Sequence, residues 1–82
     1  MERKISVKIE LMGSLVSKVK KMKPLWEFQD GITVKEILTK KFGFKVADLK
    51  YLITNVNEKS VEKDAVLNDG DTLKVFMIIG GG

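Results

Sequence analysis

The sequence predicts one α+β domain, in which a single main helix covers one face of a mixed sheet of four or five strands. Three observations support this prediction. Residues 5–12 alternate between apolar and polar, as a strand with one buried face does. Residues 33–43 carry the signals of a capped amphipathic helix. Residues 72–79 form a long, mostly apolar run after a strong turn signal.

Two strands are expected in the first third of the chain. The buried face of the first would consist of the alternating residues Ile5, Val7, Ile9 and Leu11. The lysine-rich segment 13–23 has no clear strand pattern, so we expect a long connection there, with at most a helical turn. A second short strand is expected over residues 25–29, with Trp26 and Phe28 on one face, ending at the Asp30-Gly31 turn. Two such strands can pair antiparallel.

The most clearly marked element is a helix over residues 34–42. Thr33 and Glu36 have the spacing of a capping box, in which each side chain satisfies an unpaired amide at the start of the helix. Gly43 stands where a left-handed residue commonly ends a helix. Helical spacing predicts an apolar stripe that faces the core, made of Val34, Ile37, Leu38 and Phe42.

Three smaller elements are expected between this helix and the last strand. Residues 44–50 can form a short helical turn that packs through Val46 and Leu49. Residues 51–56 are rich in strand-forming side chains. After a polar turn, the chain can return as a brief edge strand around Val61.

The last strand is predicted over residues 72–79, after the turn Asn68-Asp69-Gly70-Asp71. The helix then crosses over between two groups of strands and returns the chain to the same sheet, which buries its one apolar stripe. This order of elements is that of a β-grasp domain, and we expect it to occupy residues 1–79.

The last strand also offers a candidate docking surface. If the face that contains Val75 packs against the helix, Phe76 and Ile78 lie on the opposite, open face. Met12 is expected beside them, and Trp26 is a further candidate. Exposed apolar side chains next to a bare chain end are typical of a docking surface. The alternative is a central strand buried on both faces, which is also apolar throughout.

Three glycines, Gly80-Gly81-Gly82, follow this strand at the end of the sequence. Ordering glycine is entropically costly, so residues 80–82 are expected to form a flexible tail. A tail without side chains can enter a narrow channel, and nothing bulky shields its last carbonyl from attack. The alternative is a frayed terminus or a cloning remnant.

The composition argues against an independent enzyme and against a metal protein. The chain has no cysteine and no histidine, so it lacks a thiolate and the commonest general base and metal ligand. Asp69 and Asp71 lack the ligand series of a calcium loop and are expected to be turn residues. We therefore expect no bound metal or cofactor. No signal peptide or membrane-spanning segment is recognisable, so a cytoplasmic location without membrane contact is expected.

Part of the net charge of +4 is concentrated in Lys18, Lys20, Lys21 and Lys23. Such a run can bind RNA or another anion. It contains no arginine and no interleaved aromatic residue, so a solvated loop is favoured and no nucleic-acid partner is expected.

Three segments together resemble the MoaD/ThiS family of ubiquitin-like sulfur carriers. This family includes the small subunit of molybdopterin synthase and the thiamine-pathway sulfur carrier. The segments are the helix start 33–38, the turn 67–73 and the terminal Gly81-Gly82. The resemblance implies a ubiquitin-like β-grasp fold.

The resemblance further implies a protein substrate, not an enzyme. A ubiquitin-activating-like partner would use ATP to adenylate Gly82, and a sulfur donor would convert it to a thiocarboxylate. The thiocarboxylate would supply the large subunit of molybdopterin synthase or the thiazole synthase of thiamine biosynthesis. Gly80-Gly81 would give the tail its reach, while Phe76, Ile78 and Met12 would dock the partner.

The resemblance leaves the pathway open. The long segment between the first two strands is closer to the molybdopterin-synthase subunit, whereas the ending 78–82 is closer to the thiamine carriers. Glu58-Lys59 follow Asn57 where relatives often have glycine. Two other functions also stay open: a ubiquitin-like modifier joined through Gly82 to lysines of other proteins, and a module that binds RNA or another anion through residues 18–23.

Overall fold

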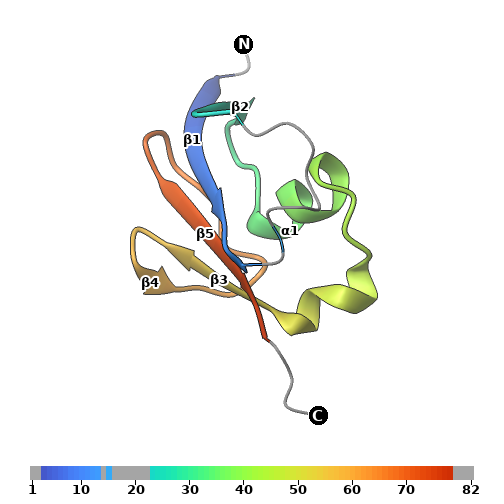
Figure 1. Ribbon diagram of the computed structural model, residues 1–82. Coiled ribbons are helices and arrows are strands. Elements are labelled where there is room, and N and C mark those ends of the chain that lie inside the picture. Colours follow the sequence, from blue (N-terminus) through green and yellow to red (C-terminus); the bar gives the residue numbers. More distant parts are fainter. Residues whose placement is uncertain (1–2, 14, 16–22, 79–82) are drawn as a thin grey trace.

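The computed structural model describes residues 3–13, 15 and 23–78. A five-stranded mixed sheet has the strand order β2-β1-β5-β3-β4 (Figure 1). The central strand, β5, is parallel to its neighbour β1, and all other neighbouring strands are antiparallel. The predicted β-grasp fold is confirmed. The strands are β1 (Lys4–Leu11), β2 (Trp26–Gln29), β3 (Leu52–Val56), β4 (Lys59–Ser60) and β5 (Thr72–Met77).

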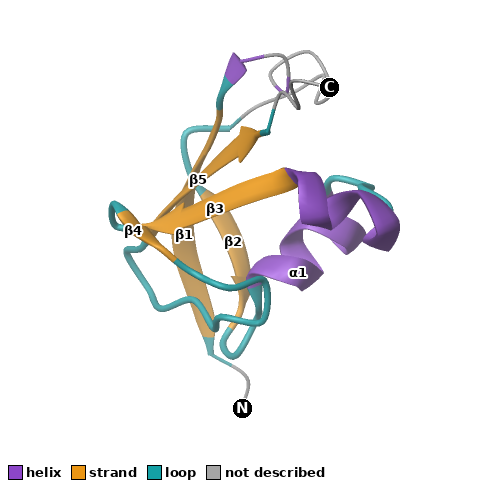
Figure 2. Ribbon diagram, turned by 90° about the horizontal axis from the view of Figure 1, so that it is seen from below, coloured by secondary structure: helices purple, strands orange, loops and turns teal. Residues whose placement is uncertain are grey.

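The main helix lies on one side of the sheet (Figures 1 and 2). It begins as α1 (Val34–Glu36) and continues directly as a wider π-helical turn, η2 (Ile37–Lys41). The Phe42 amide donates to the Ile37 carbonyl, five residues back, which is the spacing of a π-helix. The helix is therefore confirmed, but its pattern of apolar residues did not indicate the wider turn.

Both predicted ends of the helix are present. The Glu36 amide donates to the Thr33 hydroxyl oxygen at 3.2 Å, and the Thr33 amide donates to Glu36 Oε1 at 3.1 Å. This is the reciprocal arrangement of a capping box. Gly43 follows the helix with φ +77°, a conformation that side-chain-bearing residues adopt at a cost.

The predicted helical turn after Gly43 is a 3₁₀ helix, η3 (Val46–Tyr51). Leu49 is buried as expected, but Val46 is 61% exposed, so its predicted packing role is wrong. Val46 opens the helix before the chain reaches the core. Leu49 and Leu52, one and two turns later, are the residues that pack there.

The edge strand was expected around Val61. In the structure it is β4, which consists of Lys59 and Ser60 and ends just before Val61. The Val61 amide still donates to the Thr54 carbonyl at 2.9 Å. Asn57 and Glu58 form the hairpin turn with φ of +52° and +71°. Turns of this kind favour glycine because both central residues are left-handed.

One core lies between the sheet and the helix. The predicted inward-facing residues of β1 are all buried, and Trp26 packs edge-to-face against Phe42, with ring centres 5.2 Å apart. The suggestion that Trp26 joins the open face is wrong. In the β1–β2 register, Trp26 pairs with Val7 and therefore shares its buried face.

Asp69 and Asp71 are turn residues, as predicted. Asp69 Oδ1 accepts from the Ser6 amide at 2.7 Å, and Asp71 Oδ2 accepts from the Asn68 amide at 2.8 Å. The first bond ties the turn before β5 to β1, and the second lies within the turn itself. Within residues 3–13, 15 and 23–78, no acidic side chains gather as a metal site requires. Over the same residues, no helix has the length and apolar composition needed to cross a bilayer.

Candidate functional site

The candidate site lies where the chain leaves β5. This strand ends at Met77, which pairs with Leu52 at the start of β3, and the Ile78 amide still donates to the Tyr51 carbonyl at 2.7 Å. The sheet therefore holds the chain up to Ile78. Residue 79 and the glycines 80–82 lie outside the described residues, so the division into a domain over 1–79 and a flexible tail stays a prediction.

The three predicted docking residues lie around this end of β5. Leu73 and Val75 are fully buried against the helix, which leaves Phe76 half-buried and Ile78 exposed on the open side. The Met12 amide donates to the Val75 carbonyl at 3.0 Å, which places Met12 beside the end of β5. The alternative of a strand buried on both faces is wrong.

The structure adds Ile53 and Tyr51 to the predicted set. Ile53 pairs directly with Phe76 across β3 and β5, and Tyr51 precedes it by two positions. Met12, Ile53 and Ile78 are 41%, 42% and 45% exposed, respectively. We refer to Met12, Ile53, Phe76 and Ile78 as the apolar patch. Sequence reasoning missed Ile53 because its neighbour depends on the β3–β5 register, which the sequence does not specify.

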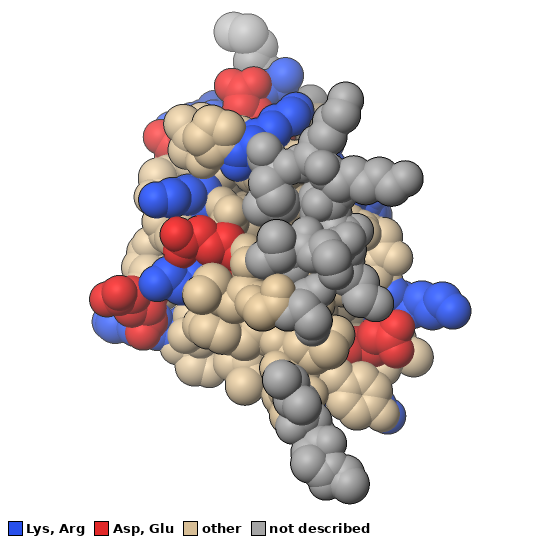
Figure 3. Space-filling view, viewed as in Figure 1, with Lys and Arg blue, Asp and Glu red and all other residues tan. Residues whose placement is uncertain are grey.

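The open face changes character along β5. At the start of the strand, Lys74 Nζ lies 3.8 Å from Glu10 Oε2, and Lys8 lies nearby on β1. In Figure 3 mostly uncharged side chains lie to the left of the point where the chain exits, and charged side chains lie further out on both sides of the view. An apolar centre beside a polar rim is typical of a protein interface.

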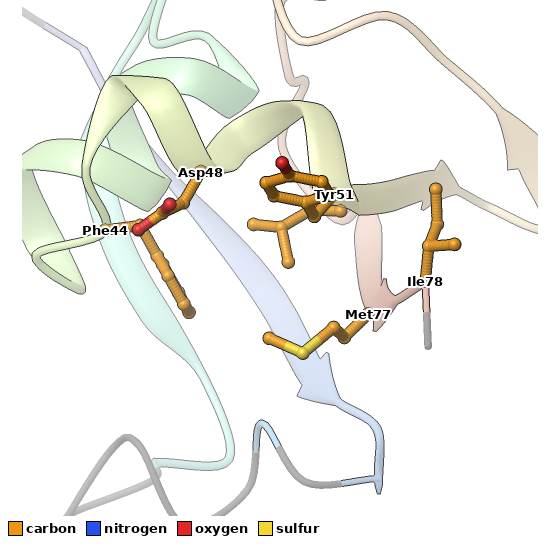
Figure 4. Close-up of a pocket in the computed structure, with 6 residues that line it drawn as sticks. Phe44, Asp48, Tyr51, Met77 and Ile78 are labelled. Carbon is orange, nitrogen blue, oxygen red and sulfur yellow. The ribbon is translucent and has the colours of Figure 1, made fainter. Parts of the chain in front are cut away.

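A pocket of about 270 Å³ adjoins the apolar patch at the same end of β5. Its lining comes from η3, from β3, from β5 and from the segment between η2 and η3. Tyr51 and Ile78 connect it to the patch. The residues that line it are Phe44, Asp48, Tyr51, Leu52, Met77 and Ile78 (Figure 4).

The carboxyl group of Glu36 has a lowered pKa. Hydrogen bonds from the Thr33 amide and hydroxyl hold the pKa of the Glu36 carboxyl below its usual value, and Lys40 adds a smaller effect. These contacts belong to the helix cap. Glu36 is therefore a structural residue and not part of the site at the end of β5.

Of the four lysines in the run, the structure describes Lys23, and the other three lie outside the described residues. Lys23 Nζ and Lys41 Nζ lie 5.2 Å and 5.4 Å from the centre of the Trp26 ring. Such distances are typical of cation–π contacts, so Lys23 packs against the domain. Anion binding by the run stays an untested alternative.

Comparisons with known proteins agree with this arrangement. The model of the ThiS family matches residues 9–82, from the middle of β1 to the last glycine. The chain matches none of the curated proteins with which it was compared.

Two solved structures have the same fold. The solution structure of the HVO 2177 protein from Haloferax volcanii has a TM-score of 0.78 at 17% identity, over 96% of this chain and 88% of that one. The solution structure of Urm1 from Trypanosoma brucei has a TM-score of 0.58 at 20% identity, over the full length of both chains. At these identities, the structural likeness supports the fold, and the family match supports the relationship.

Proposed function

The chain belongs to the ThiS family of ubiquitin-like sulfur carriers, and we propose that it carries sulfur as a thiocarboxylate on Gly82. The observation that supports this most is the reach of the family match, which continues through the three terminal glycines. The exposed apolar patch where β5 ends is the second support, because a carrier must be held by its partners at the base of its tail.

The chemistry proceeds in two steps, both on a partner enzyme. The Gly82 carboxylate attacks the α-phosphate of ATP and releases pyrophosphate, which leaves an acyl-adenylate. Sulfide then attacks the acyl carbon and displaces AMP, which leaves a thiocarboxylate on Gly82. The carboxylate needs this leaving group because it is otherwise a poor electrophile.

Catalysis by groups of the partner enzyme agrees with the composition of the chain. A chain without cysteine or histidine has few groups for acid–base or nucleophilic catalysis. The protein therefore acts as a substrate, and ATP is bound by its ubiquitin-activating-like partner. The need for ATP is compatible with the cytoplasmic location that the sequence predicts.

The apolar patch is the surface that docks the activating partner. Burial of Met12, Ile53 and Ile78 removes apolar area from water, and Phe76 supplies an aromatic side chain at its centre. β5 is paired on both sides, by β1 and β3. It is a rigid base from which to aim a tail into an active site.

The proposal leaves the acceptor of the sulfur open: the large subunit of molybdopterin synthase, the thiazole synthase of thiamine biosynthesis, or an enzyme that thiolates tRNA. Each would receive the same thiocarboxylate at the same docking surface. Supplying purified thiocarboxylate to each acceptor and measuring its product identifies the pathway.

Activation is tested by ATP–pyrophosphate exchange with the activating enzyme of the source organism. Addition of the protein should start the exchange. A variant that lacks Gly82 should not start it, because its tail is one residue shorter and its terminal carboxylate does not reach the α-phosphate of ATP. Absence of exchange with the intact chain contradicts the proposal. Gly-Gly remnants on lysines of other proteins in a proteome digest would instead favour a protein modifier.

A further inference from the structure

The pocket at the base of the tail has a lining that favours one kind of guest. Its volume of about 270 Å³ lies below the roughly 300–1,000 Å³ of most small-molecule sites. It is therefore suited to a single side chain. Figure 4 shows Asp48 and Tyr51 on one side of the pocket and Met77 on the other, with Phe44 at one end.

Among the described residues that line the pocket, Asp48 is the acidic one. Its amide donates to the Lys45 carbonyl at 2.9 Å, but its carboxylate has no ion pair among the residues that the structure describes. Lys50 lies two positions further on, yet its Nζ sits 5.2 Å from the centre of the Tyr51 ring. The pocket thus combines apolar and aromatic walls with the exposed carboxylate of Asp48, which has no ion pair to any described residue.

We propose that this pocket receives an arginine side chain from the enzyme that activates the tail. The aliphatic part of arginine would lie along Leu52 and Met77, and its guanidinium would bind the Asp48 carboxylate at the edge of the Tyr51 ring. Arginine suits these walls better than lysine, because its planar head stacks on rings and forms two parallel bonds with a carboxylate.

Two other guests fit the lining less well. An apolar side chain would cover the Asp48 carboxylate without providing it with a hydrogen-bond donor, and burial of an unpaired charge is costly. The carboxylate of the protein's own tail carries the same sign as Asp48 and would be repelled.

The contact would also help to orient the tail. The pocket and the strand end share a backbone hydrogen bond, from the Ile78 amide to the Tyr51 carbonyl. A partner side chain held between Asp48 and Met77 would therefore also fix Ile78, the last residue that the structure describes before the glycines. The identity of the partner rests on the proposed function, whereas the preference of the pocket for arginine does not.

The preference is tested first without any enzyme. N-acetyl-arginine amide is titrated into the ¹⁵N-labelled protein, and N-acetyl-citrulline amide serves as a probe of similar shape without the charge. We expect saturable shifts of the Phe44, Tyr51 and Ile78 amides with the arginine probe alone. Asp48→Asn should abolish them, and Asp64→Asn, which removes the same charge from an exposed residue outside the pocket, should not.

Equal shifts with both probes, no shifts at the pocket, or an unaffected response in Asp48→Asn overturns the preference for arginine.

The partner is tested next, by activation kinetics with the enzyme of the source organism. Loss of the charge-assisted contact in Asp48→Asn should raise the KM for the carrier about tenfold with little change in kcat, relative to Asp64→Asn. Equal KM values for the two variants overturn the role of the pocket in activation. If the unaltered protein is not activated at all, the proposed function fails, while the titration still decides the preference of the pocket.

Discussion

The two faces of the sheet differ in what their side chains contact. On the helix side, Val7, Leu73 and Val75 are fully buried. On the open side, the alternate residues of the same strands remain in contact with water, and they change from charged near Lys74 to apolar near Phe76. β5 contributes to both faces. Under the proposed function, stability depends on one set of alternating residues in β5 and partner docking on the other, so we expect that each can be altered without the other.

The largest effect is expected on the helix side. Leu73→Ala should lower the free energy of unfolding by about 2–5 kcal/mol, because it removes a fully buried side chain and leaves a cavity. A chain of 82 residues has a small free energy of unfolding, so a loss of this size is a large fraction of it. Denaturant unfolding followed by circular dichroism measures the change. A loss below about 1 kcal/mol would mean that the two faces do not differ as described.

Substitutions on the open face should weaken recognition by the activating enzyme and leave stability nearly unchanged. The double variant Met12→Ser, Ile53→Ser should raise the KM of the activating enzyme for the carrier at least about tenfold. Its free energy of unfolding should change by about 1 kcal/mol or less, since both residues are more than one-third exposed.

Leu25→Ser is the matched control, because it replaces an exposed apolar residue outside the patch. An equal rise in KM in this control would argue against a docking role for the patch.

A smaller effect, of opposite sign, is expected in the β3–β4 hairpin. Glu58→Gly should raise the free energy of unfolding by about 1 kcal/mol, because Glu58 has φ +71°, which costs a residue with a side chain about that much. Lys59→Gly, one position later in β4, should instead be neutral or destabilising. Thermal unfolding of the two variants checks the contrast. Destabilisation by Glu58→Gly would show that its side chain has a stabilising contact on the open face.

The smallest effect concerns the helix cap and depends on pH. The pKa of Glu36 is lowered in the folded state, so its carboxylate stabilises the fold at pH above its unfolded pKa. The contribution is lost as the pH falls through the lower, folded pKa. The stability difference between the unaltered protein and Glu36→Gln should therefore shrink from neutral to strongly acidic pH. A difference that stays constant over this range contradicts the role of the charge.

Local signals in the sequence were sufficient for most of the elements. The alternation in β1 and the Thr33–Glu36 capping box depend on neighbouring residues, and both are present in the structure. The placement of Trp26 failed because the face of a strand depends on its partner's register. Ile53 was missed for the same reason. The pocket around Asp48 brings together η3, β3 and β5, whose proximity follows from packing and not from spacing along the chain.

The thiocarboxylate on Gly82 is tested most directly by mass spectrometry. The protein is incubated with its activating enzyme, ATP and sulfide, and the intact chain and its C-terminal peptide are then weighed. Our account predicts a mass increase equal to the exchange of one oxygen for sulfur, located on Gly82 and absent without ATP. An unchanged mass, in a reaction where the enzyme activates a known carrier, would contradict it.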